Sequence, residues 1–378
     1  MTTTPRICIA GAGIGGLSAA LALQARGLTA TVLERSADPR PLGLGLNLLP
    51  HAVRELAALG LGPALADIAI APHSIGFFDA QGTLLHREPR GVDGGYGHPQ
   101  LSVHRGELAM LLLSTVRERL GAAAVRTGVT VTGADPDEVA ADILVGADGI
   151  HSAVRAALHP DSRIRWSGVR MYRGITRMPA FLDGRTMAII KGHNNSGQDM
   201  ELITYPVGGG RTNWVLQVTL GHPGALSGAA NWNTPTDQGA VRARLADWRI
   251  DWLDLDRLIG TAEQILEYPM VDRDPLPHWG IGPVTLLGDA AHPMYPVGAN
   301  GASQAIVDAA ALAAHLSADP GDPVAALRRY EAERRPLTTD VVLANREMLA
   351  AAADAPDELN TRARRYRHAS HADQRRGA

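Results

Sequence analysis

The chain has 378 residues, a formal net charge of −3 and a sequence pI of about 6.5. Hydrophobic residues make up 45% and charged residues 20%, proportions typical of a globular protein and unlike those of disordered or fibrous chains. The length favours two domains that share an interface, because a domain usually holds about 100 to 200 residues. The near-neutral charge provides no basic field of the kind that attracts nucleic acid, so no nucleic-acid partner is expected.

Several enzyme classes lack their signatures in this sequence. Cys8 is the only cysteine, which excludes an intrachain disulfide and a thiolate metal cage and favours a reducing, cytoplasmic location. Lys191 is the only lysine, which argues against Schiff-base chemistry with pyridoxal phosphate. The sequence contains no HExxH pair and no GxSxG elbow. We therefore expect neither a metalloprotease nor a serine hydrolase, and we expect no metal site.

The apolar run of residues 7–25 follows Arg6 and superficially resembles a signal peptide. Glycines within this run have the spacing of a nucleotide-binding fingerprint, so we interpret the run as part of the fold. No other stretch approaches the roughly 18 consecutive apolar residues of a membrane-spanning helix. We therefore expect no membrane partner.

The first elements form a βαβ unit. Residues 6–10 are an apolar run of strand type, residues 14–26 repeat leucine and alanine at helical spacing, and residues 29–34 indicate a second strand. The same periodicities predict further helices at 50–59, 105–120, 238–249, 302–316 and 324–353, a hairpin at 74–86, buried strands at 141–149 and 283–292, and β-rich segments from 168 to 220. This order predicts a discontinuous nucleotide-binding domain with an inserted sheet domain.

A glycine fingerprint joins the first strand to the first helix. Gly11, Gly13 and Gly16 form GxGxxG, and Glu34 ends the next strand. The first glycine permits a tight turn, the second lets the backbone approach a pyrophosphate, and the third lets the helix pack closely on the strand. The helix N-terminus offers free N–H groups to the phosphates, and Glu34 is placed to accept hydrogen bonds from ribose hydroxyls. NAD and FAD share this fingerprint, so the dinucleotide stays open at this point.

Two later segments resemble the downstream motifs of the class A flavoprotein aromatic monooxygenases. They are GADGIHSAVR at 146–155 and GDAAHPMYPVGANGASQAI at 288–306. The resemblance implies FAD as the cofactor, with Asp289 on the ribityl hydroxyls and residues 296–301 beside the isoalloxazine ring. The helix beginning at Ala302 is then expected to point its positive end at the reduced ring. The ring is expected to be flanked by Pro296, Gly298, Asn300 and Gly301, with no protein group assigned as a certain catalyst.

The same resemblance assigns two more residues, each with a simpler alternative. Arg105, in the segment VHRGEL, matches an arginine that contacts the phosphate and ribose region of FAD, while the alternative is a surface salt bridge with Glu107 or Glu118. Asp148, together with Arg155, supports FAD and nicotinamide binding in the family, while the alternative is a cap for the following helix. The full set expected to hold the cofactor is Gly11, Gly13, Ile14, Gly15, Gly16, Glu34, Arg35, Gly45, Arg105, Asp148, Asp289, Pro296, Gly298, Asn300, Gly301 and Ala302.

The resemblance covers almost the whole chain and implies its architecture. The fold class is α/β with an α+β insertion, namely a Rossmann-like FAD-binding domain of the glutathione-reductase type with an inserted β-sheet substrate domain and C-terminal helices. We expect residues 1–73, 98–166 and 281–320 to form the discontinuous FAD-binding domain, residues 74–97 and 167–280 the substrate domain, and residues 321–378 a C-terminal helical segment. One departure is visible: between residues 131 and 142 the chain is short where members of the family carry a longer β-meander.

Several segments, among them RPLGLGLNLLP at 40–50 and YPMVDRDPLPHWG at 268–280, especially resemble those of the 5-methylphenazine-1-carboxylate 1-monooxygenases. These are flavin hydroxylases of pigment biosynthesis that replace a ring carboxylate by hydroxyl. The resemblance implies that NADH or NADPH reduces FAD, that O2 adds to give a flavin C4a-hydroperoxide, and that its distal oxygen passes to a planar aromatic ring, with possible decarboxylation. The cofactor performs this chemistry, which accounts for the missing nucleophile triad.

The substrate is expected to lie between the inserted sheet and the flavin. The expected lining residues are Leu46, Met171, Tyr172, Arg173, Tyr205, Trp214, Met294 and Tyr295. Core packing is an equally good interpretation of the strand residues among them. Arg173 pairs either with a substrate carboxylate or with an acidic neighbour, and His292 is expected to be structural rather than a general base.

Other functions remain open on the sequence alone. They are a drug- or salicylate-modifying hydroxylase, a flavin reductase or oxidase that does not oxygenate, and a flavin-binding sensor without turnover. The expected oligomeric state is a monomer or a homodimer. The last eighteen residues hold six arginines, which are interpreted as a solvated helix end rather than a binding tail.

Overall fold

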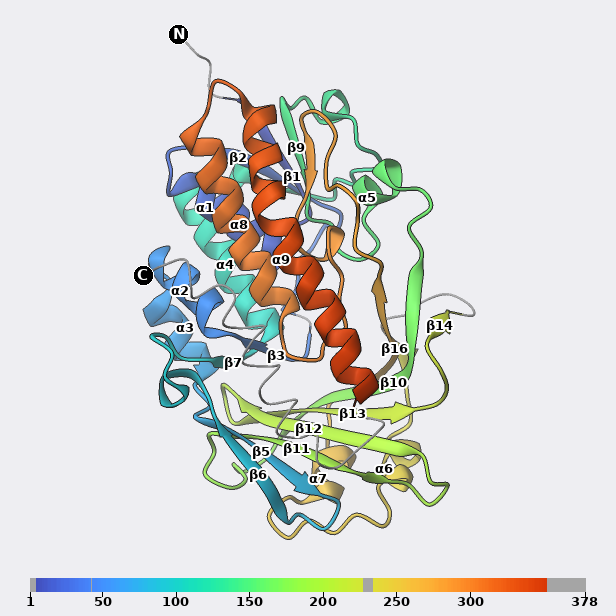
Figure 1. Cartoon of the computed structure of the whole chain (residues 1–378). Coiled ribbons are helices and arrows are strands. Elements are labelled where there is room, and N and C mark those ends of the chain that lie inside the picture. The colour runs from blue at the N-terminus through green and yellow to red at the C-terminus, as the bar shows by residue number, and fades with distance from the viewer. Residues whose placement is uncertain (1–4, 42, 227–233, 352–378) are drawn as a thin grey trace.

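The computed structural model describes residues 5–41, 43–226 and 234–351 (Figure 1), so the arginine-rich C-terminus lies outside the described residues. A five-stranded sheet of order β17-β9-β1-β2-β8 forms one part of the molecule, and all its neighbouring strands are parallel. Its strands are β1 (Ile7–Ala10), β2 (Ala30–Glu34), β8 (Val125–Thr127), β9 (Ile143–Gly146) and β17 (Val284–Leu286).

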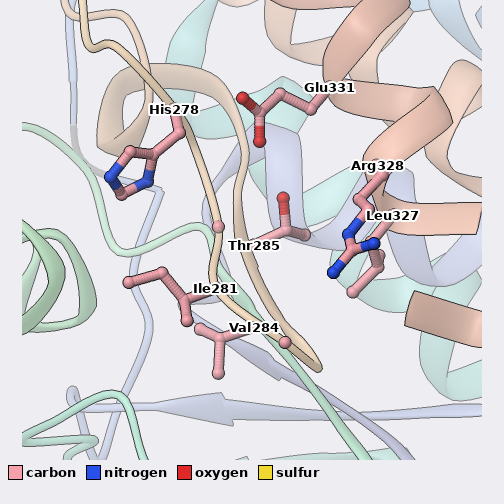
Figure 2. A pocket seen from close by; sticks show the side chains of 9 residues that line it. His278, Ile281, Val284, Thr285, Leu327, Arg328 and Glu331 are labelled. Atoms are coloured by element: carbon pink, nitrogen blue, oxygen red, sulfur yellow. The ribbon is translucent and has the colours of Figure 1, made fainter. Parts of the chain in front are cut away.

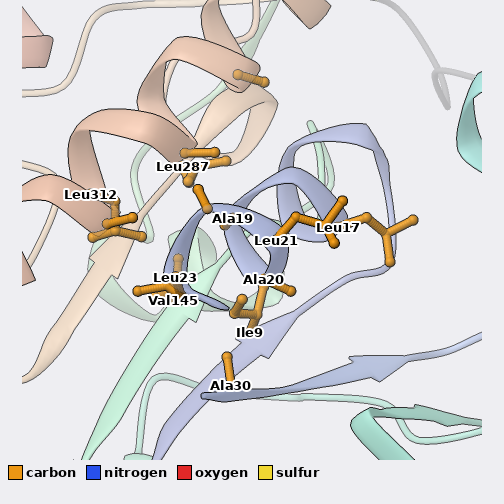
Figure 3. Packing of buried hydrophobic residues seen from close by; sticks show 14 of the residues in the cluster. Ile9, Leu17, Ala19, Ala20, Leu21, Leu23, Ala30, Val145, Leu287 and Leu312 are labelled. Atoms are coloured by element: carbon orange, nitrogen blue, oxygen red, sulfur yellow. The ribbon is translucent and has the colours of Figure 1, made fainter. Parts of the chain in front are cut away.

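Four helices stand together beside this sheet in Figure 1: α1 (Ile14–Gln24), α4 (Arg105–Leu120), α8 (Gly301–Ala318) and α9 (Pro323–Ala351). Figure 3 shows the core between them, where Ile9 and Val145 of the sheet lie near Leu21 and Leu23 of α1, with Leu312 of α8 beyond. Helix α1 packs against both α4 and α8, so nine of its residues are buried. This burial explains the all-round apolar character of its sequence.

A larger nine-stranded sheet forms the other part of the molecule, with the order β15-β16-β10-β13-β12-β11-β5-β6 and with β14 added beside β10. Only the β11–β5 pair is parallel among the described pairs of this sheet. Its strands are β5 (Ser74–Asp79), β6 (Leu84–Pro89), β10 (Ile164–Arg177), β11 (Thr186–His193), β12 (Asp199–Val207), β13 (Arg211–Thr219), β14 (Gly224–Ala225), β15 (Thr234–Pro235) and β16 (Ile265–Arg273).

One face of the large sheet packs on two short helices, α6 (Gln238–Arg244) and α7 (Leu255–Gly260), seen at the bottom of Figure 1. Trp214 is fully enclosed in this core and its Nε1 donates a hydrogen bond to Oγ1 of Thr176 at 3.2 Å. Because side chains alternate along a strand, the neighbours of Trp214 point to the other face, toward the rest of the molecule.

Short elements complete the fold. A small sheet has the order β3-β7-β4, and both of its strand pairs are antiparallel. These elements are β3 (Gly45–Leu48), β4 (Ala69–Ile70), β7 (Leu101–His104), α2 (Pro50–Ala58), α3 (Gly62–Ile68), α5 (Ala153–Leu158) and the 3₁₀ turns η1 (Gly91–Gly94), η2 (Ala122–Ala124), η3 (Pro136–Val139) and η4 (Gly288–Ala290).

The predicted α/β class, with a parallel sheet and a large second sheet, is confirmed. The long predicted helices are present, and the segment of residues 168–220 is β-rich as expected. The strand predicted at 283–292 is wrong beyond residue 286, because Gly288 has a φ of +61° and turns the chain into η4. Between residues 131 and 142 the chain forms no strand and contains the single turn η3.

Candidate functional site

A cavity of about 1150 Å³ lies where the glycine fingerprint and the α8 N-terminus face the large sheet. A volume of this size exceeds that of most single-ligand pockets, so it has room for a dinucleotide and a substrate together. Twelve of the sixteen residues expected to hold the cofactor line it: Gly13, Ile14, Gly15, Arg35, Gly45, Arg105, Asp148, Asp289, Pro296, Gly298, Gly301 and Ala302. Residues from six separate stretches of the chain (13–15, 35, 45, 105, 148 and 289–302) therefore meet at one surface.

Gly11 and Gly16 lie behind this surface. Gly11 has a φ of +104°, and a Cβ there would lie 2.6 Å from the carbonyl oxygen of Ala147. A Cβ on Gly16 would lie 2.0 Å from the carbonyl oxygen of Gly11. Gly13 differs, because a Cβ there would meet nothing within 4 Å. Gly11 and Gly16 are thus required for packing of the turn, while Gly13 leaves the cavity side open.

Glu34 lies beside the fingerprint turn and bonds to backbone rather than lining the cavity. Its Oε2 accepts a hydrogen bond from the N–H of Ala12 at 2.9 Å, and its Oε1 accepts one from the N–H of Ser36 at 2.7 Å. Each carboxylate oxygen has a second lone pair, so these bonds leave acceptor capacity for a ribose hydroxyl.

Two helices direct their N-termini at the cavity. Gly13 is the N-cap residue of α1 and Asn300 that of α8, and neither residue makes a side-chain capping hydrogen bond. Gly13 and Gly301, the first residue of α8, line the cavity. Uncapped helix N-termini carry unpaired N–H groups and a partial positive charge, which favour phosphates or an electron-rich ring. Asn300 itself is buried behind the loop, and its Oδ1 has no partner among the described residues.

The loop that leads into α8 has an unusual backbone. Gly298 and Ala299 have φ angles of +91° and +56°, and both residues line the cavity. A positive φ at alanine is costly and persists only where neighbouring structure enforces it. Helix α9 provides such support, since Nδ2 of Asn345 donates a hydrogen bond to the carbonyl oxygen of Tyr295 at 3.1 Å.

Asp148 combines the two roles considered for it. Its Oδ2 accepts a hydrogen bond at 2.7 Å from the N–H of Ala153, the first residue of α5. Its Oδ1 is buried and has no hydrogen-bond partner among the described residues, although Asp148 lines the cavity. An unpaired buried acceptor is costly, so this oxygen calls for a donor from a ligand.

Asp289 projects from η4 into the cavity, opposite the start of α8. Desolvation raises the pKa of this carboxyl, while His292 and Arg105 act in the opposite direction. Its side chain is exposed to the cavity, so a ligand there can reach it. The protein walls around the cavity still exclude much of the bulk water, which accounts for the desolvation. A carboxyl in this position is suited to accept hydrogen bonds from a bound polyol.

The two motif arginines have different surroundings. Arg105 opens into the cavity, and the neighbouring Glu107 is bound instead by Arg211, whose Nη2 lies 2.7 Å from its Oε1. The expected alternative of an Arg105–Glu107 salt bridge is therefore not formed. Arg155 is 1% exposed and donates from Nη1 to the carbonyl oxygens of Ala290 and Ala291 at 3.0 and 2.7 Å. Arg155 thus braces the turn that carries Asp289 rather than lining the cavity.

A buried ionic network supports this turn from below. Oδ2 of Asp308 lies 2.5 Å from Nε2 of His292 and accepts a hydrogen bond from the N–H of Gly288 at 3.2 Å. Nε of Arg334, on α9, donates to Oδ1 of the same carboxylate at 2.9 Å. Gln304 completes the group by accepting from Nη2 of Arg334 at 2.5 Å. His292 is therefore structural, as expected, and no sequence pattern pointed to its partners.

The large sheet supplies the opposite wall through the two-residue period of its strands. Met171, Arg173, Ile175 and Arg177 of β10 all line the cavity. Tyr172 lies on the other face, where the guanidinium carbon of Arg244 is 5.1 Å from its ring centroid. Trp214 belongs to the same hidden core. This corrects the expectation that Tyr172 and Trp214 line the pocket, because consecutive residues of a strand point to opposite faces.

Five of the eight expected substrate residues line the cavity: Leu46, Met171, Arg173, Tyr205 and Met294. Tyr295 does not line it, since its side chain is buried in a cluster with Met171, Val215 and Tyr268. Sequence reasoning missed thirteen further lining residues of the sheet: Phe77, Ile175, Arg177, Met187, Ile189, Glu201, Ile203, Arg211, Val215, Gln217, Leu266, Tyr268 and Val271. The alternation within each strand contains this signal once one cavity-facing position is known.

A smaller cavity of about 260 Å³ lies at the outer edge of the parallel sheet, between residues 278–285 and α9 (Figure 2). Thr285, Arg328 and Glu331 are among its lining residues, and none of the predicted site residues lines it. Among the described residues no cluster of histidine, cysteine or acidic side chains has the geometry to hold a metal ion. None of the helices in the described part of the chain combines the length and apolar character needed to cross a membrane.

The residues of the large cavity fit FAD. At the fingerprint, Gly13 leaves open space next to the uncapped N-terminus of α1. Asp148 contributes a carboxylate oxygen without a hydrogen-bond partner among the described residues. The 288–302 loop adds the carboxyl group of Asp289 and the uncapped N-terminus of α8. This set matches an elongated ligand with a pyrophosphate and a polyol, bound along a series of backbone donors and acidic acceptors.

Comparisons with known proteins agree with this geometry. Residues 4–345 match the FAD_binding_3 family, whose description is FAD binding domain. The chain is 48% identical to phenazine 1,6-dicarboxylic acid hydroxylase PhzS of Lysobacter antibioticus, over 96% of both chains. It is 35% identical to 3-amino-4-hydroxybenzoate 2-monooxygenase PtmB3 of Streptomyces platensis, over 91% of this chain and 87% of the relative.

Solved structures share the fold. The chain resembles Klebsiella pneumoniae HpxO, solved with FAD and uric acid, with a TM-score of 0.77, 26% identity and coverage of 96% and 92% of the two chains. CtdE, solved with FAD and a substrate, superposes with a TM-score of 0.80 at 21% identity over 95% and 92% of the chains, which supports the fold alone. The family match spans most of the sequence, and the curated relatives are aromatic hydroxylases. The chain therefore belongs to the class A flavoprotein monooxygenases and is an FAD-dependent aromatic hydroxylase.

Proposed function

We propose that this enzyme hydroxylates a planar aromatic carboxylate of the phenazine type, with NADH or NADPH and O2 as cosubstrates. The observation that carries the proposal is one cavity of about 1150 Å³. The residues that fit FAD line one side of it, and a mostly apolar face of the large sheet lines the other. A broad apolar wall opposite the cofactor suits a flat ring system better than a compact polar substrate. The 48% identity to a phenazine dicarboxylate hydroxylase supports the same substrate class.

Binding of the cofactor is assigned to the parallel-sheet half. The backbone N–H groups of Gly13, Ile14 and Gly15 hold the pyrophosphate, Asp289 accepts hydrogen bonds from the ribityl chain, and Arg105 neutralises phosphate charge. Residues 1–73, 98–166 and 281–320 form the domain that does this in the proposal. Residues 74–97 and 167–280 form the substrate domain, and the helical segment from residue 321 braces both.

The ring of the cofactor is assigned to the space between Gly45 and the loop of residues 296–302. The N-terminus of α8 stabilises negative charge that develops on the reduced ring, because the first N–H groups of a helix are unpaired and its end is positive. FAD, when bound, supplies the hydride acceptance and oxygen activation that no side chain of the cavity provides.

The protein's own contribution is positioning and exclusion of water. Met171, Leu266 and Val215 form an apolar surface over the ring site, and Leu46 and Met294 close it from the cofactor side. An apolar enclosure keeps water from the reacting atoms and holds the aromatic ring at the distance that oxygen transfer needs. We place the reaction in the cytoplasm, where reduced nicotinamides are supplied and buried Cys8 stays reduced.

The test is oxygen-isotope incorporation with a panel of rings. The FAD-loaded enzyme is supplied with NADH or NADPH, ¹⁸O2 and either phenazine-1-carboxylate, phenazine-1,6-dicarboxylate or 3-hydroxybenzoate, and products are identified by mass. We expect one ¹⁸O atom in a phenazine product, together with faster nicotinamide oxidation, and the product mass reports whether the carboxylate is lost. Label derived from water, or turnover of the benzoate alone, would overturn the proposal.

A further inference from the structure

Arg173 has an unusual position on the substrate side of the cavity. It lies on the cavity face of β10, and its Nη2 donates a hydrogen bond to the carbonyl oxygen of Gly45 at 3.0 Å. Its guanidinium carbon lies 5.6 Å from the ring centroid of Tyr268, and its Nε is buried without a hydrogen-bond partner among the described residues. The guanidinium is thus held on two sides by neutral groups and has spare donor capacity.

No described carboxylate pairs with Arg173, whereas other arginines of the cavity have acidic partners. Arg211 binds Glu107 at 2.7 Å, and Nε of Arg177 lies 3.8 Å from Oε1 of Glu263 at the exposed rim. Glu201 lies on β12, two strands away from β10, and its Oε2 is 3.5 Å from Nζ of Lys191. Arg35 and Arg105 belong to the cofactor half of the cavity. Arg173 is therefore the substrate-side arginine whose charge the described residues leave uncompensated.

The surroundings of Arg173 make that charge costly. Met171 and Ile175 flank it along β10, and Leu266 and Tyr268 of β16 lie beside it on the same wall. Desolvation raises the pKa of Tyr268, so its hydroxyl stays neutral and supplies no compensating anion. A partly desolvated cation among apolar groups gains most from an anionic ligand, since charge-assisted hydrogen bonds strengthen where water is excluded.

We propose that Arg173 is the specificity-determining residue of the substrate pocket and that it binds a carboxylate group of the aromatic substrate. A guanidinium is suited to this role because its planar donors match a carboxylate in two parallel hydrogen bonds. The bond to Gly45 and the contact with Tyr268 preorganise it, so little side-chain freedom is lost on binding. The inference rests on the proposed function for the identity of the ring, but the preference for a carboxylate is a separate property of this one side chain.

The experiment compares two ligands of nearly equal shape, phenazine-1-carboxylate and phenazine-1-carboxamide. Their dissociation constants are measured on FAD-loaded protein through the change they cause in flavin absorbance, with no turnover. We expect the wild type to prefer the carboxylate by about 10- to 100-fold, the range for charge-assisted hydrogen bonds. Arg173→Met is expected to abolish the preference, and Arg173→Lys to retain part of it.

A matched control removes an arginine from the same strand outside the cavity. Arg170 lies on β10 and its Nη1 pairs with Oε1 of Glu267 at 2.8 Å on the half-exposed surface. Arg170→Met should keep the full preference for the carboxylate. The FAD dissociation constant of each variant is measured in parallel. If Arg173 only held Gly45 or the cofactor, Arg173→Met would weaken FAD binding but leave the preference for the carboxylate ligand intact. That result would overturn the proposal.

A second ligand panel separates this inference from the proposed function. Benzoate, salicylate and nicotinate are compared with their amides on the same proteins. If neither phenazine ligand binds but one of these rings shows an Arg173-dependent preference for its carboxylate, the substrate proposal fails and the assignment of Arg173 stands. If the wild type prefers no carboxylate over its amide, or if Arg173→Met keeps the preference, the assignment of Arg173 fails.

Discussion

The Oδ2 atom of Asp308 lies 2.5 Å from Nε2 of His292, and the side chains of the two residues are 0% and 3% exposed. The same carboxylate binds Arg334 of α9 and the backbone of Gly288. One buried charge thus connects two helices to the turn that carries Asp289. Breaking a buried pair by removing one partner leaves the other charge uncompensated, so this connection is sensitive to single substitutions.

Asp308→Asn is expected to lower the free energy of unfolding by about 3–5 kcal/mol, because it strands Arg334 in a dry environment. The measurement is urea unfolding of the FAD-free protein. The control is Glu333→Gln, which removes the exposed His315–Glu333 pair between the same helices at 2.8 Å and should cost about 0–1 kcal/mol. Equal effects of the two substitutions would show that burial of the pair is unimportant.

Gly13→Val should yield a folded but colourless protein. A Cβ at residue 13 meets no protein atom within 4 Å, and the backbone there has a φ of −76°, which valine tolerates. The side chain would instead occupy the space next to the uncapped N-terminus of α1. Circular dichroism checks the fold, and the flavin absorbance of the purified protein checks loading.

Gly16→Ala is the contrasting substitution in the same fingerprint. Its Cβ would lie 2.0 Å from the carbonyl oxygen of Gly11, so this variant is expected to lose folded protein rather than FAD alone. Retention of FAD by Gly13→Val at the affinity of the wild type would contradict the assignment of the pyrophosphate to this turn.

FAD affinity should fall in mildly acidic solution because of Asp289. Burial raises the pKa of this carboxyl above its usual value. The ionised form accepts hydrogen bonds from ribityl hydroxyls, and protonation removes part of that capacity. The affinity is therefore expected to be constant well above the raised pKa and to weaken as the pH falls through it.

The measurement is the FAD dissociation constant from flavin fluorescence, taken from neutral to mildly acidic pH. Asp289→Asn should bind FAD more weakly throughout and should lose this pH dependence, while its circular dichroism stays unchanged. An identical slope in the asparagine variant would assign the pH dependence to another group.

Cys8 should be inert in the native protein. Desolvation in the centre of the parallel sheet raises its pKa to about 11, against a smaller opposing effect of Arg126. The nucleophilic thiolate is then scarce at neutral pH, and the buried sulfur is out of reach. A chromogenic disulfide reagent is expected to titrate one thiol in urea and none in buffer. Rapid stoichiometric reaction without urea would show that β1 opens locally.

The sequence was most informative where one local rule fixes both structure and role. The glycine spacing at residues 11–16 and the helical repeat after it predicted the fingerprint, because each glycine of the motif is required for a separate steric reason. The fold class followed from the order of strands and helices. Glu34 shows the limit, since its distance along the chain did not reveal that both its oxygens bind the backbone.

The substrate side was predicted less well because it depends on the parity of each strand. The expected lining set contains the consecutive residues Met171, Tyr172 and Arg173, yet only alternate residues of a strand face the same side of a sheet. Which parity faces the cavity depends on how the sheet packs against the rest of the molecule. The partners of Asp308 were unpredictable for a related reason, since they come from three segments that approach only in the folded chain.

Helix α9 connects the two halves of the molecule through two ion pairs. Its Arg334 is fixed to Asp308, while its Arg346 binds Asp272 of β16 with Nε 2.6 Å from Oδ2. These two anchors are about 18 Å apart along the helix axis, given a rise of about 1.5 Å per residue. The helix therefore fixes the distance between the large sheet and the 288–302 loop. Inserting one residue between the anchors would rotate the far one by about 100° and change the spacing between the two walls of the large cavity.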